Sequence, residues 1–192
     1  LTRAEAADGR RAQRSTIGPL DGVPYTLKDI IDVADIPTGA GSRLYEGNVP
    51  TQSATSAARL EDGGAVLLAK ARTHEFAWGG TTLPARNAWD PDRIPGGSSG
   101  GSASSVASGI GTFTLGTDTA GSVRSPANFN GVAGLKPTYG RIGRSGVVPL
   151  AWTLDTMGVL ARSVRDVAVV YDEIAGPDPL DPTSVATPHD PV

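Results

Sequence analysis

The chain has 192 residues, of which 39% are hydrophobic and 19% charged, as in an ordinary globular protein and unlike a disordered one. Its net charge of −3 and its scattered arginines argue against direct binding to nucleic acid or to an anionic membrane. The absence of cysteine excludes disulfides, thiolate nucleophiles and cysteine-ligated metals. No apolar run approaches the roughly 20 residues of a membrane span, and no signal-peptide pattern is present, so we expect a cytoplasmic protein.

The first predicted elements are a helix and a strand. Residues 1–14 are polar, with alanines at helical intervals, and predict an exposed helix. After a Gly- and Pro-containing turn, residues 23–28 alternate as a strand does, with Val23, Tyr25 and Leu27 on one face. Lys28 therefore lies on the opposite face, near the carboxyl end of the strand. Sites in α/β sheets form at that end.

The later elements alternate between helix and strand. The patterns predict helices over 53–62, 102–108 and 163–174, and strands over 65–69 and 112–117. The continuous apolar run at 65–69 is typical of a strand buried on both faces. Alternating helices and strands indicate a layered α/β fold.

The composition also suggests how the chain is divided. We assign residues 1–16 to an N-terminal helix, 17–176 to the core, and 177–192 to a linker or the start of a continuation. The last stretch contains five prolines from Pro177 onward and almost no large apolar residues, so we predict that it does not pack.

Residues 95–108 form a dense Gly/Ser tract, PGGSSGGSASSVAS. Such a tract is usually a flexible linker. Here a small-residue helix pattern and a strand follow at once, which favours a tight turn at a helix N-terminus, where several N–H groups are exposed. The tract also matches the G-x-S-x-G nucleophile elbow around Ser98. That motif requires a preceding strand, and the Pro-containing residues 90–95 cannot be a central strand.

A second turn of small residues, 117–126, follows a predicted strand and has Ser122 at its tip. The backbone N–H groups of Thr119, Ala120, Gly121 and Ser122 could converge there as an oxyanion hole. Asp118 and Arg124 bracket the turn, and charge-assisted hydrogen bonds between them could hold it. The residues alone leave Ser98 and Ser122 as rival nucleophiles.

A hydroxyl nucleophile needs a base. The chain has two histidines: His189 lies in the Pro-rich tail, and no spacing ties His74 to either serine. The other candidate is a buried lysine, because burial lowers the pKa of a lysine. The chain has 17 basic residues, of which only Lys28, Lys70 and Lys136 are lysine. The strand position favours Lys28.

Taken together, these segments resemble the amidase signature family. The resemblance runs from about residue 17 to 176, and its motifs occur in order, as GVP…KD at 22–29, PGGSSGGS at 95–102, GTDTAGSVR at 116–124, GVAGLKPTYGR at 131–141 and LDTMG at 154–158. A match in order over so many segments is far more specific than any one of them. Ala120 departs from the pattern, since many members have glycine there.

The resemblance implies a Ser–Ser–Lys triad, with Ser122 as the nucleophile, Ser98 as a bridging serine after a cis peptide bond, and Lys28 as the base. It implies a three-layer α/β/α fold with a mixed sheet and chemistry that needs no metal or organic cofactor. Family members are considerably longer, so we expect this chain to correspond to the N-terminal part and to lack some of the sheet and substrate pocket.

The resemblance implies two activities. One is a stand-alone hydrolase that cleaves a small-molecule amide through an acyl-enzyme, with a second copy of itself in a homodimer as its candidate protein partner. The other is the glutaminase-like subunit of a tRNA-dependent amidotransferase, working with partner subunits. A third hypothesis is a non-catalytic fragment or relative of the family. All three triad positions are filled, which argues against loss of the catalytic residues.

Overall fold

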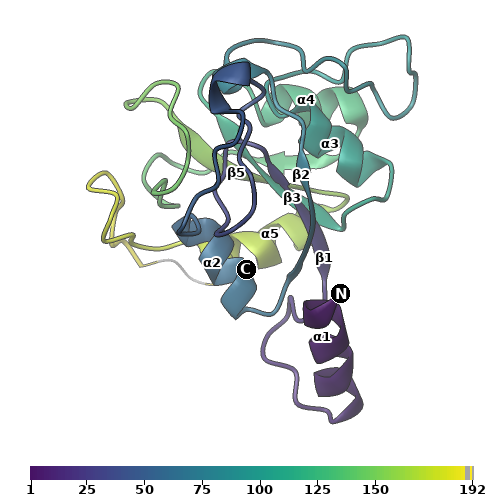
Figure 1. Ribbon diagram of the computed structural model, residues 1–192, viewed down its shortest axis with the longest axis vertical. Helices are drawn as coiled ribbons and strands as arrows, with labels where there is room; N and C mark the ends of the chain where they lie inside the picture. Colours follow the sequence, from purple (N-terminus) through teal and green to yellow (C-terminus); the bar gives the residue numbers. More distant parts are fainter. Residues whose placement is uncertain (189–190, 192) are drawn as a thin grey trace.

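A single five-stranded sheet forms the centre of the computed structural model, which describes residues 1–188 and 191 (Figure 1). The strands, in the spatial order β2-β1-β3-β5-β4, are β1 (Pro24–Lys28), β2 (Val66–Ala71), β3 (Phe113–Asp118), β4 (Ala133–Leu135) and β5 (Thr156–Ala161). β1 pairs in parallel with β2 and β3, whereas β5 pairs antiparallel with β3 and β4. The sheet is therefore mixed, as predicted.

Helices cover both faces of the sheet (Figure 1). The α-helices are α1 (Thr2–Ala12), α2 (Thr55–Asp62), α3 (Gly100–Ala107), α4 (Arg124–Asn130) and α5 (Val164–Ile174), and η1 (Arg43–Tyr45) and η2 (Glu75–Ala77) are short 3₁₀ turns. α3 and α4 pack on one face, and α2 and α5 on the other. This arrangement confirms the expected three-layer α/β/α fold. None of the helices in the described part of the chain has the length and hydropathy needed to span a membrane.

The two faces of the sheet differ in chemistry. Toward α2 and α5 the sheet is apolar, and Leu27 and Leu115 are fully buried in the main core. Toward α3 some of the buried contacts are polar, because α3 is built mainly from Gly, Ser and Ala, and a small apolar cluster that includes Ala103 and Leu160 lies beside them. Thr26 Oγ1 lies 2.9 Å from Ser105 Oγ, for example. Lys28 follows on this polar side, at the end of β1.

Most of the predicted elements are present with small shifts in their ends. The prediction for residues 65–69 was wrong in one respect, because β2 is an edge strand and Leu68 is 51% exposed. A continuous apolar run does not distinguish a central strand from an edge strand. The helix α4, the strands β4 and β5 and the two 3₁₀ turns were not predicted.

The prediction that residues 177–192 do not pack was wrong for the described part of that stretch. Asp178 and Asp181 are buried, and their carboxylates accept backbone N–H groups within the stretch and from residues 144 and 145. A Pro-rich composition excludes helix and sheet but not packing, because aspartates can satisfy the backbone of an irregular segment. Residues 189, 190 and 192 lie outside the described residues.

Candidate active site

Lys28 ends β1 and is completely buried. Its Nζ donates a hydrogen bond to Ser98 Oγ at 2.6 Å and another to Thr117 Oγ1 at 2.8 Å. The first contact joins the end of β1 to the Gly/Ser tract, and the second joins it to the end of β3. Lys28 is thus tied to both of the segments that carry candidate nucleophiles.

Burial changes the acid–base behaviour of Lys28. Loss of hydration lowers the pKa of Lys28 from 10.5 to about 7, while the negative charges of Asp118 and Asp155 act in the opposite direction. An amine with such a pKa is substantially unprotonated near neutral pH. Lys28 can therefore accept a proton, which an ordinary surface lysine does not do.

Ser98 is held as firmly as Lys28. It is fully buried, and the Gly97–Ser98 peptide bond is cis, as the family resemblance implies. Its carbonyl oxygen accepts three hydrogen bonds, from the backbone N–H of His74 and from the hydroxyls of Thr73 and Thr82. These contacts hold the backbone at Ser98, and its hydroxyl accepts the hydrogen bond from Lys28.

The glycines around Ser98 allow close backbone approach. A Cβ on Gly97 would lie 2.5 Å from the backbone nitrogen of Thr81, and one on Gly101 would lie 2.5 Å from the carbonyl oxygen of Arg72. The tract is a packed turn that leads into α3, so the linker reading is excluded. No strand precedes it over residues 90–95, so the elbow reading fails as well.

The turn after β3 is organised by Asp118, which is fully buried. Its carboxylate accepts backbone N–H groups from Gly121, Val123 and Arg124, and the guanidinium of Arg124 donates to both of its oxygens. Burial raises the pKa of Asp118, but these hydrogen bonds outweigh that effect and hold it below its ordinary value. A carboxylate that is ionised near neutral pH thus stabilises the turn that contains Ser122.

These contacts bear on the expected oxyanion hole. The Gly121 N–H is already donated to Asp118 at 2.7 Å, so in this structure it is committed to the turn. The N–H groups that Asp118 accepts do not include those of Thr119, Ala120 and Ser122. Ala120 is not among the described non-glycine residues with positive φ, so the alanine is accommodated without left-handed strain.

Ser122 lines a pocket of about 690 Å³. The pocket is predominantly apolar, and none of its described lining residues is charged; they are Ala77, Trp78, Gly79, Gly80, Gly97, Thr119, Ala120, Gly121, Ser122, Ser125, Phe129, Leu150, Ala151 and Leu154. The Ser122 carbonyl accepts the backbone N–H of Ser99 at 3.2 Å, which places the two serine-bearing segments side by side. Among the contacts of the described residues, the Ser122 hydroxyl has no hydrogen-bond partner.

The structure brings some of the other candidates near the site and places others elsewhere. The backbone of His74 contacts Ser98, but its ring packs against Gly79. Lys70 forms an ion pair with Asp29, and Lys136 donates to a neighbouring carbonyl. His189 lies outside the described residues.

Sequence reasoning missed two side chains that affect Lys28. Thr117 hydrogen-bonds its Nζ, and Asp155 acts on it through charge. Both lie inside motifs that carry the family resemblance, so the motifs marked them without indicating a role.

The chain is similar to known proteins over nearly its whole length. The family model described as Amidase matches residues 1–192. The glutamyl-tRNA(Gln) amidotransferase A subunit of Moorella thermoacetica is 48% identical over 98% of this chain and 40% of its own length. The chain therefore spans about 40% of the length of the curated relatives it matches.

Two solved structures are also similar to this chain. The peptide amidase of Stenotrophomonas maltophilia superimposes with a TM-score of 0.92 at 39% identity, covering 99% of this chain and 41% of that one. The glutamyl-tRNA(Gln) amidotransferase A subunit of Thermotoga maritima superimposes with a TM-score of 0.86 at 41% identity, over 89% of this chain and 39% of that one.

Proposed function

This chain belongs to the amidase family, and we propose that it carries the catalytic centre of a serine amidase that cleaves carboxylic amides through an acyl-enzyme on Ser122. The observation that carries the proposal is the 2.6 Å contact between Lys28 Nζ and Ser98 Oγ in a fully buried setting. A buried amine with a pKa of about 7, joined to a serine hydroxyl, is a general base in position to relay a proton.

In the first half-reaction, neutral Lys28 accepts the Ser98 hydroxyl proton, and Ser98 takes the proton of Ser122. The Ser122 oxygen forms a bond to the amide carbonyl carbon, and negative charge develops on the carbonyl oxygen. The free backbone N–H groups of the 119–122 turn would receive that oxyanion. The carbon–nitrogen bond then breaks as protonated Lys28 returns its proton through Ser98 to the leaving nitrogen.

In the second half-reaction, water replaces the amine. Lys28 and Ser98 remove a proton from the water, which attacks the acyl carbon, and the proton returns to the Ser122 oxygen as the ester bond breaks. The products are a carboxylic acid and ammonia or an amine. The original Ser122 proton leaves with the amine and a proton from water replaces it, so each cycle restores the triad.

The lining of the pocket and the similar proteins favour different candidate functions. The uncharged lining supplied by the described residues suits an amide with an apolar acyl group, because it offers no partner for an ionised substrate group. The identity of 48% and 52% to two amidotransferase A subunits favours the second candidate, a glutaminase-like subunit that acts with partner subunits.

Covalent labelling tests the nucleophile. A fluorophosphonate should label the wild-type protein, expressed in its complete reading frame, and labelling should be lost in Ser122→Ala and greatly slowed in Lys28→Ala. Ser125→Ala, in the same pocket, is the matched control and should be labelled normally. Undiminished labelling of Ser122→Ala would falsify the assignment.

Ammonia release separates the two candidates. A stand-alone hydrolase should release ammonia from neutral primary amides without any other protein. An amidotransferase subunit should act on glutamine and respond strongly to added partner subunits. The same Ser122→Ala variant serves as the blank in both assays.

A further inference from the structure

One wall of the pocket beside Ser122 is an irregular loop. Leu150, Ala151 and Leu154 belong to it and line the pocket together with Thr119 and Ser122. The loop joins the segment after β4 to β5 and contains no helix or strand over residues 149–155. Within the loop the backbone N–H groups of Leu154 and Asp155 donate to the Ala151 carbonyl oxygen, and side-chain contacts hold the loop against its neighbours.

The carboxylate of Asp155 connects this wall to the nucleophile turn. Its Oδ2 accepts the backbone N–H groups of Leu150 at 2.8 Å and Ala151 at 2.9 Å. Its Oδ1 accepts the hydroxyl of Thr119 at 2.5 Å, at the start of the turn that ends in Ser122. Asp155 is only 8% exposed, so these three charge-assisted bonds are protected from water.

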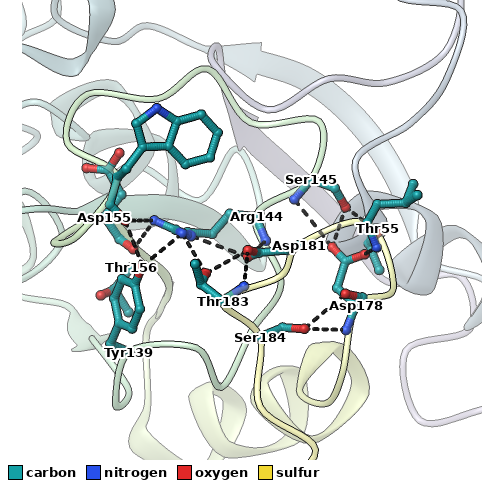
Figure 2. Close-up of polar contacts among 12 residues, drawn as sticks. Thr55, Tyr139, Arg144, Ser145, Asp155, Thr156, Asp178, Asp181, Thr183 and Ser184 are labelled. Carbon is teal, nitrogen blue, oxygen red and sulfur yellow. Dashed lines mark hydrogen bonds and ion pairs between the residues drawn. The ribbon is translucent and has the colours of Figure 1, made fainter.

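Arg144 holds the backbone that bears Asp155. Its Nη1 donates to the carbonyl oxygens of Trp152 at 2.7 Å and Asp155 at 3.2 Å, and Figure 2 shows it between Asp155 and Asp181. Its Nε forms an ion pair with Asp181 at 3.3 Å, and Arg144 is also largely buried. The stretch that follows α5, through Asp181, thereby supports the pocket loop.

We propose that Asp155 is a positioning residue for the amidase reaction, whose carboxylate fixes the nucleophile turn at Thr119 against the pocket wall at Leu150 and Ala151, with Arg144 and Asp181 holding it in place. The inference rests on the proposed function and deepens it. It identifies the contact that keeps the oxyanion donors and the acyl pocket in register during acyl transfer.

The charge of Asp155 gives the proposal a second signature. Lys28 is faced by two carboxylates, Asp118 and Asp155, whose charges both raise its pKa, and by the uncharged hydroxyls of Ser98 and Thr117. When the Asp155 charge is removed, Asp118 is the carboxylate that still opposes the effect of burial. The pKa of Lys28 therefore falls further. The acid limb of the pH–rate profile then moves to lower pH.

The test compares three variants in the complete reading frame, with active sites counted by fluorophosphonate titration. Asp155→Asn loses one acceptor oxygen and the charge. Thr119→Val loses only the hydroxyl that bonds Asp155, and Thr119→Ser restores it. The matched control is Asp178→Asn, because Asp178 is 2% exposed, belongs to the neighbouring network in Figure 2, and does not line the pocket.

We expect kcat/KM per titrated site to fall about 10- to 100-fold in Asp155→Asn and by a smaller factor in Thr119→Val, since displacing reacting groups by about 1 Å has effects of this size. Thr119→Ser should recover most of the rate lost in Thr119→Val. The acid limb should move to lower pH in Asp155→Asn alone. Asp178→Asn should change thermal stability without changing either readout.

Two results would overturn the proposal for Asp155, and a third would overturn the proposed function. If Asp155→Asn behaves as Asp178→Asn does, with fewer active sites but an unchanged kcat/KM and pH profile per site, Asp155 is merely structural and the proposal is wrong. If Asp155→Asn does not fold, Thr119→Val and Thr119→Ser decide the question, and equal rates in these two overturn it. If wild-type Ser122 is never labelled, the proposed function itself fails.

Discussion

Lys28 Nζ lies 2.6 Å from Ser98 Oγ, and neither side chain is exposed to solvent. A lysine in this position is a poor structural element, because burying an ammonium group is unfavourable unless it is paired. Its two direct partners, Ser98 and Thr117, are neutral hydroxyls. The arrangement is better suited to an amine that cycles between its two protonation states, and the first predictions follow from this.

Replacing Lys28 by arginine should greatly slow the proposed reaction although the positive charge is kept. Arginine stays protonated at any accessible pH and cannot accept a proton from Ser98. We expect kcat/KM to fall by roughly 10²- to 10⁴-fold, the usual contribution of a general base. Lys70→Arg, which alters an ion pair with Asp29 but none of the hydrogen bonds of Lys28 Nζ, is the control and should retain activity. Comparable losses in both variants would point to a general packing effect.

The rate of amide hydrolysis should depend on pH through Lys28. Its pKa is lowered to about 7, and the neutral form is the active one, so kcat/KM should rise with pH and level off above an inflection at about 7. Measurement with an uncharged amide avoids substrate titration. An inflection near 10.5, the ordinary value for lysine, would contradict the proposed role.

Much of the backbone structure around this site was predictable from the sequence alone. Strand alternation over residues 23–28 placed Lys28 at a carboxyl end, and the small residues around Ser98 and Ser122 indicated two tight turns. The structure has both features. The pairing of Asp118 with Arg124 also followed from their places on either side of the turn. These features are local in sequence, which is why sequence patterns reveal them.

The remaining features depend on contacts between distant segments. Asp155 reaches Thr119 across 36 positions, and Arg144 reaches Asp181 across 37. Neither the periodicity nor the composition of a segment encodes such a partner. The prolines around Asp181 exclude regular structure and therefore predict an unpacked stretch. Its buried aspartates become informative only once Arg144 is placed beside them.

Lys28 should also make folding stability depend on pH. In the folded state its pKa is about 7, against 10.5 for the unperturbed group, so between these values the unfolded chain binds the extra proton. The free energy of unfolding should therefore rise with pH across that window, by up to about 1.4 kcal/mol per pH unit from this group. Below the folded-state pKa the full penalty for burying the charge remains.

Denaturant unfolding of Lys28→Met isolates this contribution. The variant lacks the titrating group, so it should be more stable than the wild type near neutral pH, and the difference should shrink as the pH approaches about 10. All other titrating groups are shared by the two proteins and cancel in the comparison. Unfolding free energies that run parallel at every pH would show that Lys28 is not buried as the structure has it.

The same substitution in two helices should have opposite effects on stability. Gly9 lies in α1 and Gly101 in α3, and alanine is intrinsically favoured over glycine in a helix by about 1 kcal/mol. A methyl group at Gly9 meets no atom within 4 Å, so Gly9→Ala should stabilise the protein by about that amount.

At Gly101 the methyl group would lie 2.5 Å from the Arg72 carbonyl oxygen and 2.8 Å from its nitrogen, both backbone atoms that cannot rotate away. Gly101→Ala should therefore destabilise the protein by about 1–3 kcal/mol, because α3 must move away from the backbone at Arg72. Since α3 begins just after Ser98, the same shift should lower the rate of Ser122 labelling, whereas Gly9→Ala should leave it unchanged. Equal stability changes in the two variants would show that α3 does not pack against the sheet as closely as described.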